Sequence, residues 1–214
     1  MIATLSHETF AVAQDNMDFD LNQMTGNKDA MIRIYTWQTP GITYPERRPG
    51  PVSTWDVDIA HRPTGGGILF HSPGSIVFSI GIPTSQSPFP KSLKATLSLV
   101  GQWIQFSLIA CGYDVVPDTD SHTANHLYCA SYPNPYELRY NGQKVVAMAL
   151  RRWQSAILVQ GIIHVVSNFP YFAHLGPDIH PFLSRGLGLT DTDTPRLRTE
   201  LIRQLPIRLP ISIQ

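Results

Sequence analysis

The stretch YELRYNGQKVVAMAL, residues 136–150, is the part of the sequence that most restricts the fold. It contains two strand-like runs joined by Asn141-Gly142, the dipeptide most typical of a tight β-hairpin turn. The run ILVQGIIHVV, residues 157–166, predicts a further strand close behind it. Because a hairpin joins antiparallel neighbours, at least part of the protein must be an antiparallel sheet.

Helical spacing of apolar residues marks three other segments. In residues 92–111, which precede a typical terminating glycine, one face carries Leu93, Leu97, Val100, Ile104, Leu108 and Cys111. In residues 9–24, one face carries Phe10, Ala13, Met17, Leu21 and Met24. A shorter helix opens at Pro195 and carries a stripe of Leu197, Leu201 and Leu205.

Strands are also predicted at residues 32–37 and near 56–61 and 76–82, whereas the proline-rich residues 43–51 predict a loop. Helices and strands do not alternate as they do in parallel βαβ units. The predicted fold class is therefore α+β, with a mixed, mostly antiparallel sheet flanked by helices. We expect residues 1–214 to form a single domain.

The composition argues against several classes of protein. The 16 basic and 16 acidic residues cancel, which disfavours a nucleic-acid-binding surface. No apolar run approaches the roughly 18 residues of a membrane helix, and the first residues lack a signal-peptide pattern. Two cysteines without a CxxC motif disfavour a disulfide framework or a zinc site. We expect a cytoplasmic protein with no bound metal and with neither nucleic-acid nor membrane partners.

Three consecutive glycines in HRPTGGGILFHSPG, residues 61–74, predict a binding loop. A backbone without Cβ atoms can approach a ligand closely and point several N–H groups at it. Arg62 before the glycines and His71 after them suit a carboxylate, phosphate or thioester carbonyl. The alternatives are a tight turn between two strands and a purely structural histidine.

Lys144 and Cys129 are the other candidates for chemistry. Lys144 follows the hairpin turn inside a strand-like run, where it is either a functional ammonium or a charge that protects an edge strand. Cys129 lies in LYCASYPNPYEL with no core periodicity around it, and a neighbouring cation would favour its thiolate. Cys111, on the apolar helix face, is predicted to be a buried, inert thiol. His122 and His126 are close to Cys129 in sequence, but nothing indicates that they point inward.

Several motifs together resemble the biotin/lipoate protein ligase superfamily, in particular its lipoate ligases and octanoyltransferases. HRPTGGGILFHSPG is similar to the signature RRPTGG…V.H, and DNMDFDL (residues 15–21) to the NM..D helix. IRIYTWQTPGIT (residues 32–43) resembles LRFY.W.PP..S, and NGQKVVAMAL (residues 141–150) falls where the family has G.K..GSA. LYCASYPNPYEL keeps the CF..P..YEL spacing of the cysteine-dependent members. The resemblance covers about residues 9–165, and residues 166–214 form a C-terminal extension with a short helix.

The resemblance implies an acyltransferase of protein lipoylation. Cys129 would carry an octanoyl or lipoyl group as a thioester, and Lys144 would stabilise the oxyanion at the carbonyl. The implied substrate-binding residues are Arg62, Thr64, Gly65, Gly66, Gly67, His71, Ala147 and Ala149. The apolar tail would lie along Ile68, Phe70 and Val77.

The implied partners are lipoyl carrier domains, such as the glycine cleavage H protein or the E2 subunit of a 2-oxoacid dehydrogenase. An acyl carrier protein is a further implied partner, and no bound cofactor is expected.

Three departures from the family pattern keep two alternatives open. Ala147-Met148-Ala149 replaces Gly-Ser-Ala, Ser72 follows His71 where most ligases have Asp, and TYPERR replaces a loop glycine. One alternative is a lipoate–protein ligase that uses ATP and Mg²⁺ but lacks an accessory domain. The other is a non-catalytic member that binds a lipoyl domain, which the bulk of Met148 would favour. A biotin ligase is disfavoured, because the GRGR-type loop of that class is missing.

Overall fold

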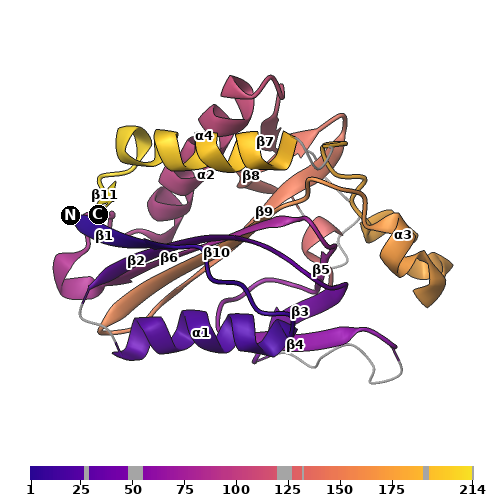
Figure 1. The fold of residues 1–214 in the computed structure, drawn as a ribbon, viewed down its shortest axis with the longest axis horizontal. Helices are drawn as coiled ribbons and strands as arrows, with labels where there is room; N and C mark the ends of the chain where they lie inside the picture. Colours follow the sequence, from indigo (N-terminus) through magenta and orange to yellow (C-terminus); the bar gives the residue numbers. More distant parts are fainter. Residues whose placement is uncertain (27–28, 48–54, 120–126, 132, 190–192, 214) are drawn as a thin grey trace.

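The computed structural model describes residues 1–26, 29–47, 55–119, 127–131, 133–189 and 193–213. Its centre is an eight-stranded sheet with the order β11-β1-β2-β6-β10-β9-β8-β7 (Figure 1). β1 is parallel to both β2 and β11, and the remaining neighbours are antiparallel. The predicted α+β class with a mostly antiparallel sheet is thereby confirmed. The strands are β1 (Ile2–Ser6), β2 (Ala30–Thr36), β6 (Ile76–Pro83), β7 (Val116–Asp118), β8 (Asn134–Tyr140), β9 (Gln143–Arg152), β10 (Ala156–Ile163) and β11 (Ser212–Ile213).

The predicted hairpin joins β8 to β9. Asn141 and Gly142 have φ angles of 47° and 77°, the left-handed pair that a type I′ turn requires. β9 in turn pairs with β10, so it lies inside the sheet and not at its edge. The pairing of β8 with β9 shifts by one residue between Leu138 and Arg139, which makes Val145 the extra residue of a β-bulge.

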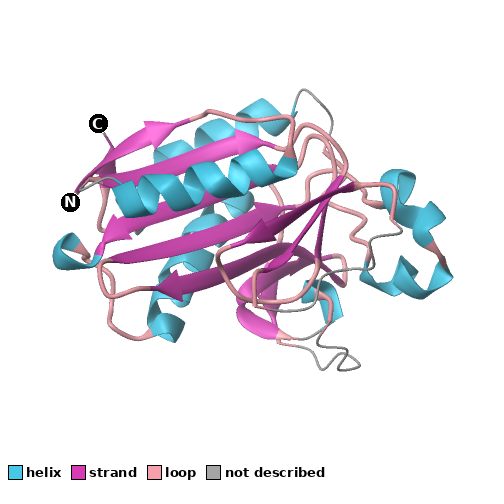
Figure 2. Cartoon of the chain, turned by 90° about the horizontal axis from the view of Figure 1, so that it is seen from below, coloured by secondary structure: helices cyan, strands magenta, loops and turns pink. Residues whose placement is uncertain are grey.

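Three long helices cover the two faces of this sheet. α2 (Leu93–Ala110) and α4 (Asp193–Arg208) lie together on one face, and α1 (Ala13–Gly26) lies on the other (Figure 1). Figure 2 views the molecule from the side of α1. α2 ends before Gly112, whose φ of 94° confirms the predicted glycine terminator. Leu93, in contrast, is 47% exposed, because the first residue of the helix lies outside the buried interface.

α1 begins at Ala13 and not at residue 9. The amide of Ala13 donates a 2.6 Å hydrogen bond to the carboxylate of Asp58, so a residue far along the chain determines where the helix starts. Ala13 and Met17 are buried as predicted, whereas Phe10 precedes the helix. Periodicity alone could not reveal this start, because the capping group is 45 residues away.

A second, three-stranded sheet lies on the same side as α1. It has the order β4-β3-β5 and consists of β3 (Gly41–Pro45), β4 (Asp58–Arg62) and β5 (Leu69–His71). The loop prediction is therefore wrong for residues 43–45, where Thr43 and Tyr44 are buried in strand pairs. Pro45 stands at the end of its strand, a position that strands tolerate.

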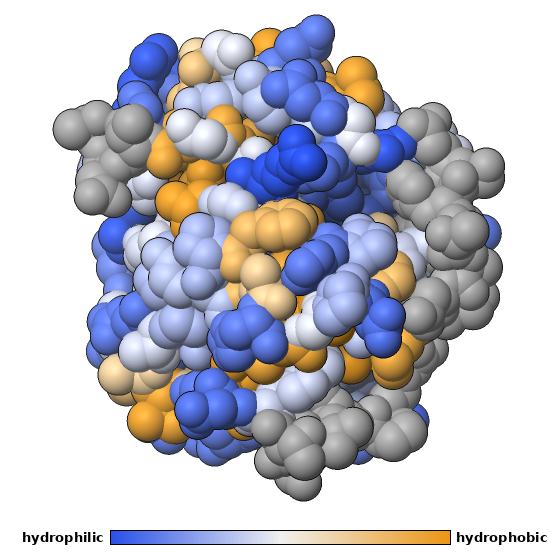
Figure 3. All heavy atoms as spheres, turned by 90° about the vertical axis from the view of Figure 1, so that its right-hand side faces the viewer, coloured by the Kyte–Doolittle hydropathy of each residue, from blue (hydrophilic) through white to orange (hydrophobic). Residues whose placement is uncertain are grey.

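Short helical turns gather at the end of the molecule that carries α3. They cover an aromatic cluster in which Tyr128 stacks on Phe182 with ring centroids 4.2 Å apart. On this end of the surface, hydrophilic groups surround a hollow, and hydrophobic side chains emerge between them (Figure 3). The turns are α3 (Phe169–Phe172), η3 (Ala173–Leu175) and η4 (Pro177–Phe182), and elsewhere η1 (Thr84–Gln86) and η2 (Cys129–Ser131).

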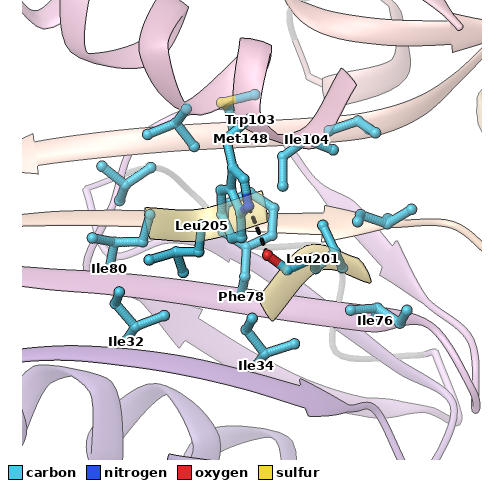
Figure 4. Close-up of a cluster of buried hydrophobic side chains, with 14 of the residues drawn as sticks. Ile32, Ile34, Ile76, Phe78, Ile80, Trp103, Ile104, Met148, Leu201 and Leu205 are labelled. Carbon is cyan, nitrogen blue, oxygen red and sulfur yellow. Dashed lines mark hydrogen bonds between the residues drawn. The ribbon is translucent and has the colours of Figure 1, made fainter. Parts of the chain in front are cut away.

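The larger hydrophobic core lies between the sheet and the pair α2 and α4 (Figure 4). Trp103 of α2 packs edge-on against Phe78 of β6, and its indole N–H donates to the Leu201 carbonyl at 2.9 Å. The predicted stripe of α4 is buried as expected, with Leu197, Leu201 and Leu205 each at most 1% exposed. In the described part of the chain, no helix combines the length and apolar character needed to cross a membrane.

Candidate active site

A narrow cavity lies on the α1 face of the large sheet, between α1, β5, β6, β9, β10 and the turn η2. Its free volume is about 30 Å³ and its wall is almost entirely apolar. Six of the residues predicted from the sequence line it, namely Arg62, His71, Val77, Cys129, Ala147 and Ala149. Residues not predicted as part of the site line it as well, among them Thr43, Leu69, Gln160 and Gly161.

Cys129 brings a sulfur atom to the wall of this cavity. The residue is only 6% exposed and opens the turn η2, and its amide donates a hydrogen bond to the carbonyl of Ile68, the residue that precedes β5. The amide of Gly67 lies 3.2 Å from Sγ and donates to it, while the S–H group reaches the Gly67 carbonyl at 3.3 Å. One nitrogen of the Arg62 guanidinium lies 3.8 Å from the same sulfur. A donor and a cation thus converge on the sulfur.

Arg62 is a buried cation that donates hydrogen bonds mainly to carbonyl groups, with one more to the hydroxyl of Thr43. It donates to the carbonyl oxygens of Thr43, Gly65 and Gly67 at 2.6–3.1 Å, and it is 4% exposed. Among the described residues, no carboxylate forms an ion pair with it. Its positive charge therefore stays available to an anion in the cavity, because burial strengthens such an attraction.

The three glycines of the motif differ in whether the structure would tolerate a side chain at their position. Gly66 has a φ of 101°, a conformation that residues with a side chain rarely adopt. A Cβ atom on Gly67 would come within 2.6 Å of the Leu127 carbonyl oxygen and 2.9 Å of the Cys129 nitrogen. Gly65 would meet nothing within 4 Å. The motif thus lets the backbone approach the Cys129 segment, and neither these glycines nor Thr64 border the cavity.

Lys144 is buried beside Cys129, so the alternative of an edge-strand charge is wrong. Its ammonium lies 2.6 Å from Glu137, 2.9 Å from Asp118 and 3.0 Å from the Cys129 carbonyl oxygen. Burial disfavours the charge on Lys144, but the two carboxylates outweigh it and raise the pKa of the ammonium. Burial raises the pKa of Glu137 although Lys144 acts in the opposite direction.

A polar groove of about 230 Å³ reaches Lys144 from the surface, and it also borders Ala130, Arg139 and Ser184. The ammonium therefore borders this groove and not the apolar cavity.

His71 is held by its neighbours on two sides. Its ring stacks on Trp37 at 4.1 Å, and Nε2 is hydrogen-bonded to the hydroxyl of Thr43 at 2.8 Å. Burial, followed by the influence of His164 and Arg62, lowers the pKa of His71 far below its usual value. His164, which the sequence interpretation did not single out, is also buried, and burial lowers its pKa to about 4.

A buried hydrogen-bond network adjoins the cavity through Gln160. Thr64 donates to the amide oxygen of Gln160 at 2.8 Å, and the amide nitrogen donates to Asp20 at 2.7 Å. Asp20 is ion-paired with Arg33 at 2.9 Å, and both side chains are completely buried. Arg33 also donates to Asn16, so the polar positions of the motif at residues 15–21 serve this network.

Two expectations about the cavity wall are wrong. Ile68 and Phe70 do not line it, because they belong to the aromatic cluster, whereas Leu69 between them faces the cavity. Alternate residues of a strand point to opposite sides, so the slot contains Leu69 and Val77. Met148 borders the cavity, but its side chain packs in the larger core beside Trp103 (Figure 4). Its bulk therefore does not fill the slot.

The remaining candidates lie elsewhere. Cys111 caps the C-terminal end of α2 and is only partly buried, on the opposite side of the sheet from Cys129. His122 and His126 lie outside the described residues.

Comparison with known proteins assigns this fold and cavity to a family. Residues 43–180 match the family described as lipoyl protein ligase A/B catalytic domain, and the chain belongs to that family. The match begins within β3 and includes the glycine motif, Cys129 and Lys144. No curated protein sequence gives a match.

Solved structures share the fold at low sequence identity. Lipoate-protein ligase A bound with ATP superposes with a TM-score of 0.74 at 15% identity, covering 100% of this chain and 88% of the other. A bi-partite lipoate protein ligase of Thermoplasma acidophilum, studied with its E2 lipoyl domain, gives 0.71 at 14% identity, covering 100% and 86%. P. falciparum LipL1 in complex with lipoate gives 0.60 at 13% identity, covering 95% and 58%.

Proposed function

We propose that this protein is an acyltransferase of protein lipoylation that works through a thioester on Cys129. The observation that carries the proposal is the position of the Cys129 sulfur, which lies at the wall of an apolar cavity, 3.2 Å from the Gly67 amide and 3.8 Å from the Arg62 guanidinium. A thiolate in that place has a hydrogen-bond donor and a cation beside it, which are the surroundings that favour a nucleophilic cysteine. The membership in the lipoyl ligase A/B family supports an octanoyl or lipoyl group as the acyl chain.

The reaction would proceed in two transfers. In the first, the sulfur of Cys129 forms a bond to the carbonyl carbon of an acyl thioester, and the donor thiol leaves with the proton of the cysteine. In the second, the amine of an acceptor lysine forms the amide bond, the bond to Cys129 breaks, and the thiol regains its proton from the amine. Both transfers develop negative charge on the carbonyl oxygen, and the unpaired charge of Arg62 is available to stabilise it.

Lys144 takes a positioning role in this proposal. An ammonium has three N–H donors, and three acceptors surround it, the carboxylates of Glu137 and Asp118 and the carbonyl of Cys129. In this arrangement it fixes the Cys129 backbone, whereas the sequence interpretation expected it at the substrate oxyanion. The groove beside Lys144 would admit the carrier-bound end of the acyl group, because its lining is mostly polar whereas the lining of the cavity is apolar.

The expected partners are lipoyl carrier domains as acceptors and an acyl-carrying thiol as donor. The likeness to a bi-partite lipoate protein ligase that was analysed together with its E2 lipoyl domain supports a domain of that kind as a partner. The alternative is an ATP-dependent ligase, and the likeness to a ligase bound with ATP supports this alternative.

The decisive experiment incubates the protein with octanoyl-acyl carrier protein and a lipoyl domain, and follows the masses of both proteins. We expect an octanoyl adduct on Cys129 and then on the acceptor lysine. Cys129→Ser should reduce transfer by at least about a thousandfold, as expected for a covalent nucleophile. Cys111→Ala is the matched control, because that thiol lies on the other face of the sheet, and it should transfer at the parent rate. Equal rates for Cys129→Ser and the parent would reject covalent catalysis, and pyrophosphate release from ATP and lipoate would favour the ligase.

A further inference from the structure

The side chain of Gln160 is held in one orientation at the cavity wall. Both oxygens of the Asp20 carboxylate accept hydrogen bonds, Oδ1 from Arg33 and Oδ2 from Ser79 and Gln160, so the amide nitrogen of Gln160 must face Asp20. The amide oxygen accepts from Thr64 at 2.8 Å. The first N–H of the amide therefore points to Asp20, and the second remains for another acceptor.

The acceptor for that second N–H is the thioether of Met17. The amide nitrogen of Gln160 lies 3.7 Å from the sulfur atom of Met17, and both residues line the cavity. This contact explains why the wall is apolar although a glutamine forms part of it, since the sulfur covers the polar group. Thioether sulfur is a weak acceptor, and methionine has an unbranched, flexible side chain.

An acyl chain can enter only if part of this wall moves. The free volume is about 30 Å³, whereas an apolar cavity that accommodates benzene measures about 150 Å³. Met17 and Met148 have the most flexible apolar side chains of this wall, and Met148 is packed in the larger core. Displacement of Met17 is therefore the simplest way to open the slot. The second N–H of Gln160 then loses its sulfur partner and faces the tail of the bound chain.

Gln160 and Cys129 line the same cavity. Ile162 packs in the same cluster as Cys129 and Ala147, and Gln160 is two residues away on β10, on the same face. An acyl chain whose carbonyl is at Cys129 and whose tail lies in this cavity therefore extends along the wall that carries Gln160.

We propose that Gln160 makes the slot selective for an acyl tail that ends in sulfur, that is, for a lipoyl group over an octanoyl group. This inference rests on the proposed function and specifies its substrate. In a lipoyl complex, the ring sulfur replaces the Met17 sulfur as the acceptor of the Gln160 N–H. In an octanoyl complex, the same N–H is buried against methylene groups without a partner, which disfavours that complex.

The test compares the binding of two neutral, unreactive amides by titration calorimetry, lipoamide and octanamide, which share the amide head and differ in the tail. We expect the parent protein to bind lipoamide more tightly. Gln160→Met keeps most of the side-chain length but removes the donor, and it should reduce this preference by about threefold to tenfold, the value of one hydrogen bond. Met17→Leu is the matched control, because the Met17 sulfur is the acceptor of the Gln160 N–H only in the free protein. It should tighten both ligands and leave the preference unchanged.

A third ligand makes the test independent of variant folding. In 5-cyclopentylpentanamide the ring keeps its size but has no sulfur, and the parent should bind it about threefold to tenfold more weakly than lipoamide. Equal binding of these two ring compounds would overturn the proposal, as would an unchanged preference in Gln160→Met or an equal loss of preference in Met17→Leu. Binding of all three compounds without preference would reject the selectivity alone. Failure of the parent to bind any of them would reject the proposed function as well.

Discussion

The two faces of the eight-stranded sheet are made by alternate residues of the same strands, yet they are chemically different. On β2, Ile32 and Ile34 face the core under α2 and α4, whereas Arg33 between them is buried on the α1 face. On β6, Phe78 belongs to the core and Ser79 binds Asp20 on the α1 face. The core face follows the general rule that apolar side chains are buried together. The α1 face buries charges and hydrogen-bonding groups, an arrangement that a fold does not need for stability.

The difference indicates what each face does for the protein. Burial of apolar area between the sheet and the two helices is the main source of stability. Every buried charge on the α1 face needs a specific partner to compensate for its lost hydration. The α1 face is also the one that carries the cavity and Cys129. Substitutions should therefore affect the α1 face through lost partners and the core face through lost packing.

Among substitutions on the α1 face, Lys144→Met should have the largest effect on stability. The substitution leaves the buried carboxylates of Glu137 and Asp118 without the ammonium between them, and we expect the free energy of unfolding to fall by about 3–5 kcal/mol at pH 8. This differs from an exposed hairpin lysine, whose replacement would be nearly neutral. The loss should be smaller at pH 5, because burial already raises the pKa of Glu137 and the carboxyl group can take up a proton.

Denaturant unfolding at both pH values measures this effect. Arg203→Met is the control. Arg203 forms an ion pair with Glu200, but its side chain is 57% exposed, so no measurable change in the free energy of unfolding is expected. Similar stability of Lys144→Met and the parent at pH 8 would mean that the buried charge cluster does not stabilise the α1 face.

The second expected effect concerns pH and His164. Burial lowers the pKa of His164 to about 4 in the folded state, against about 6.5 in the unfolded chain. Between these values the unfolded state binds a proton that the folded state does not, so stability falls as the pH falls from 6.5 to 4. This single group should account for a loss on the order of 3 kcal/mol over that range.

His164→Gln, which does not titrate, isolates this contribution from those of the carboxyl groups. The stability of the variant should depend less steeply on pH than that of the parent below pH 6.5, and the two slopes should agree above it. Parallel curves for the two proteins over the whole range from pH 7 to 4 would contradict a depressed pKa at His164.

The smallest expected effect separates the first and the third glycine of the motif. Gly67→Ala places a Cβ atom within 2.6–2.9 Å of the backbone of residues 127–129 and should destabilise the protein by about 1–3 kcal/mol. Transfer activity should fall on the order of a hundredfold, because the clash displaces Cys129. Gly65→Ala meets nothing within 4 Å and should preserve both properties. Thermal unfolding and the transfer assay would show whether the two variants differ, and equal behaviour would assign the glycines no role in placing Cys129.

The core face was the easier one to predict from the sequence. The stripe of α4, the apolar face of α2 and the Asn141-Gly142 turn follow from local spacing and local backbone preference. Their expected positions hold in the structure, apart from Leu93 at the exposed start of α2 and Cys111 at its end, which is only partly buried.

The α1 face depends on partners that lie far apart in the sequence. The start of α1 is set by Asp58, and the surroundings of Lys144 are set by Asp118 and Glu137 from two other strands. No local pattern contains this information. One signal was present, since Gln160 and His164 are the two polar residues of ILVQGIIHVV and their spacing of four places them on one face of the strand.

The bulge at Val145 changes how this region must be compared between related chains. Val145 and Val146 both pack in the larger core, so Lys144 and Ala147 lie on the same side of the strand although three positions separate them. In an unbulged strand, two residues separated by an odd number of positions lie on opposite sides. A relative that lacked Val145 would keep its lysine on the α1 side of the sheet, and the alanine would follow two positions after the lysine. An alignment of this hairpin therefore has to place its gap at the bulge, and counting odd and even positions across it would assign Lys144 to the wrong face.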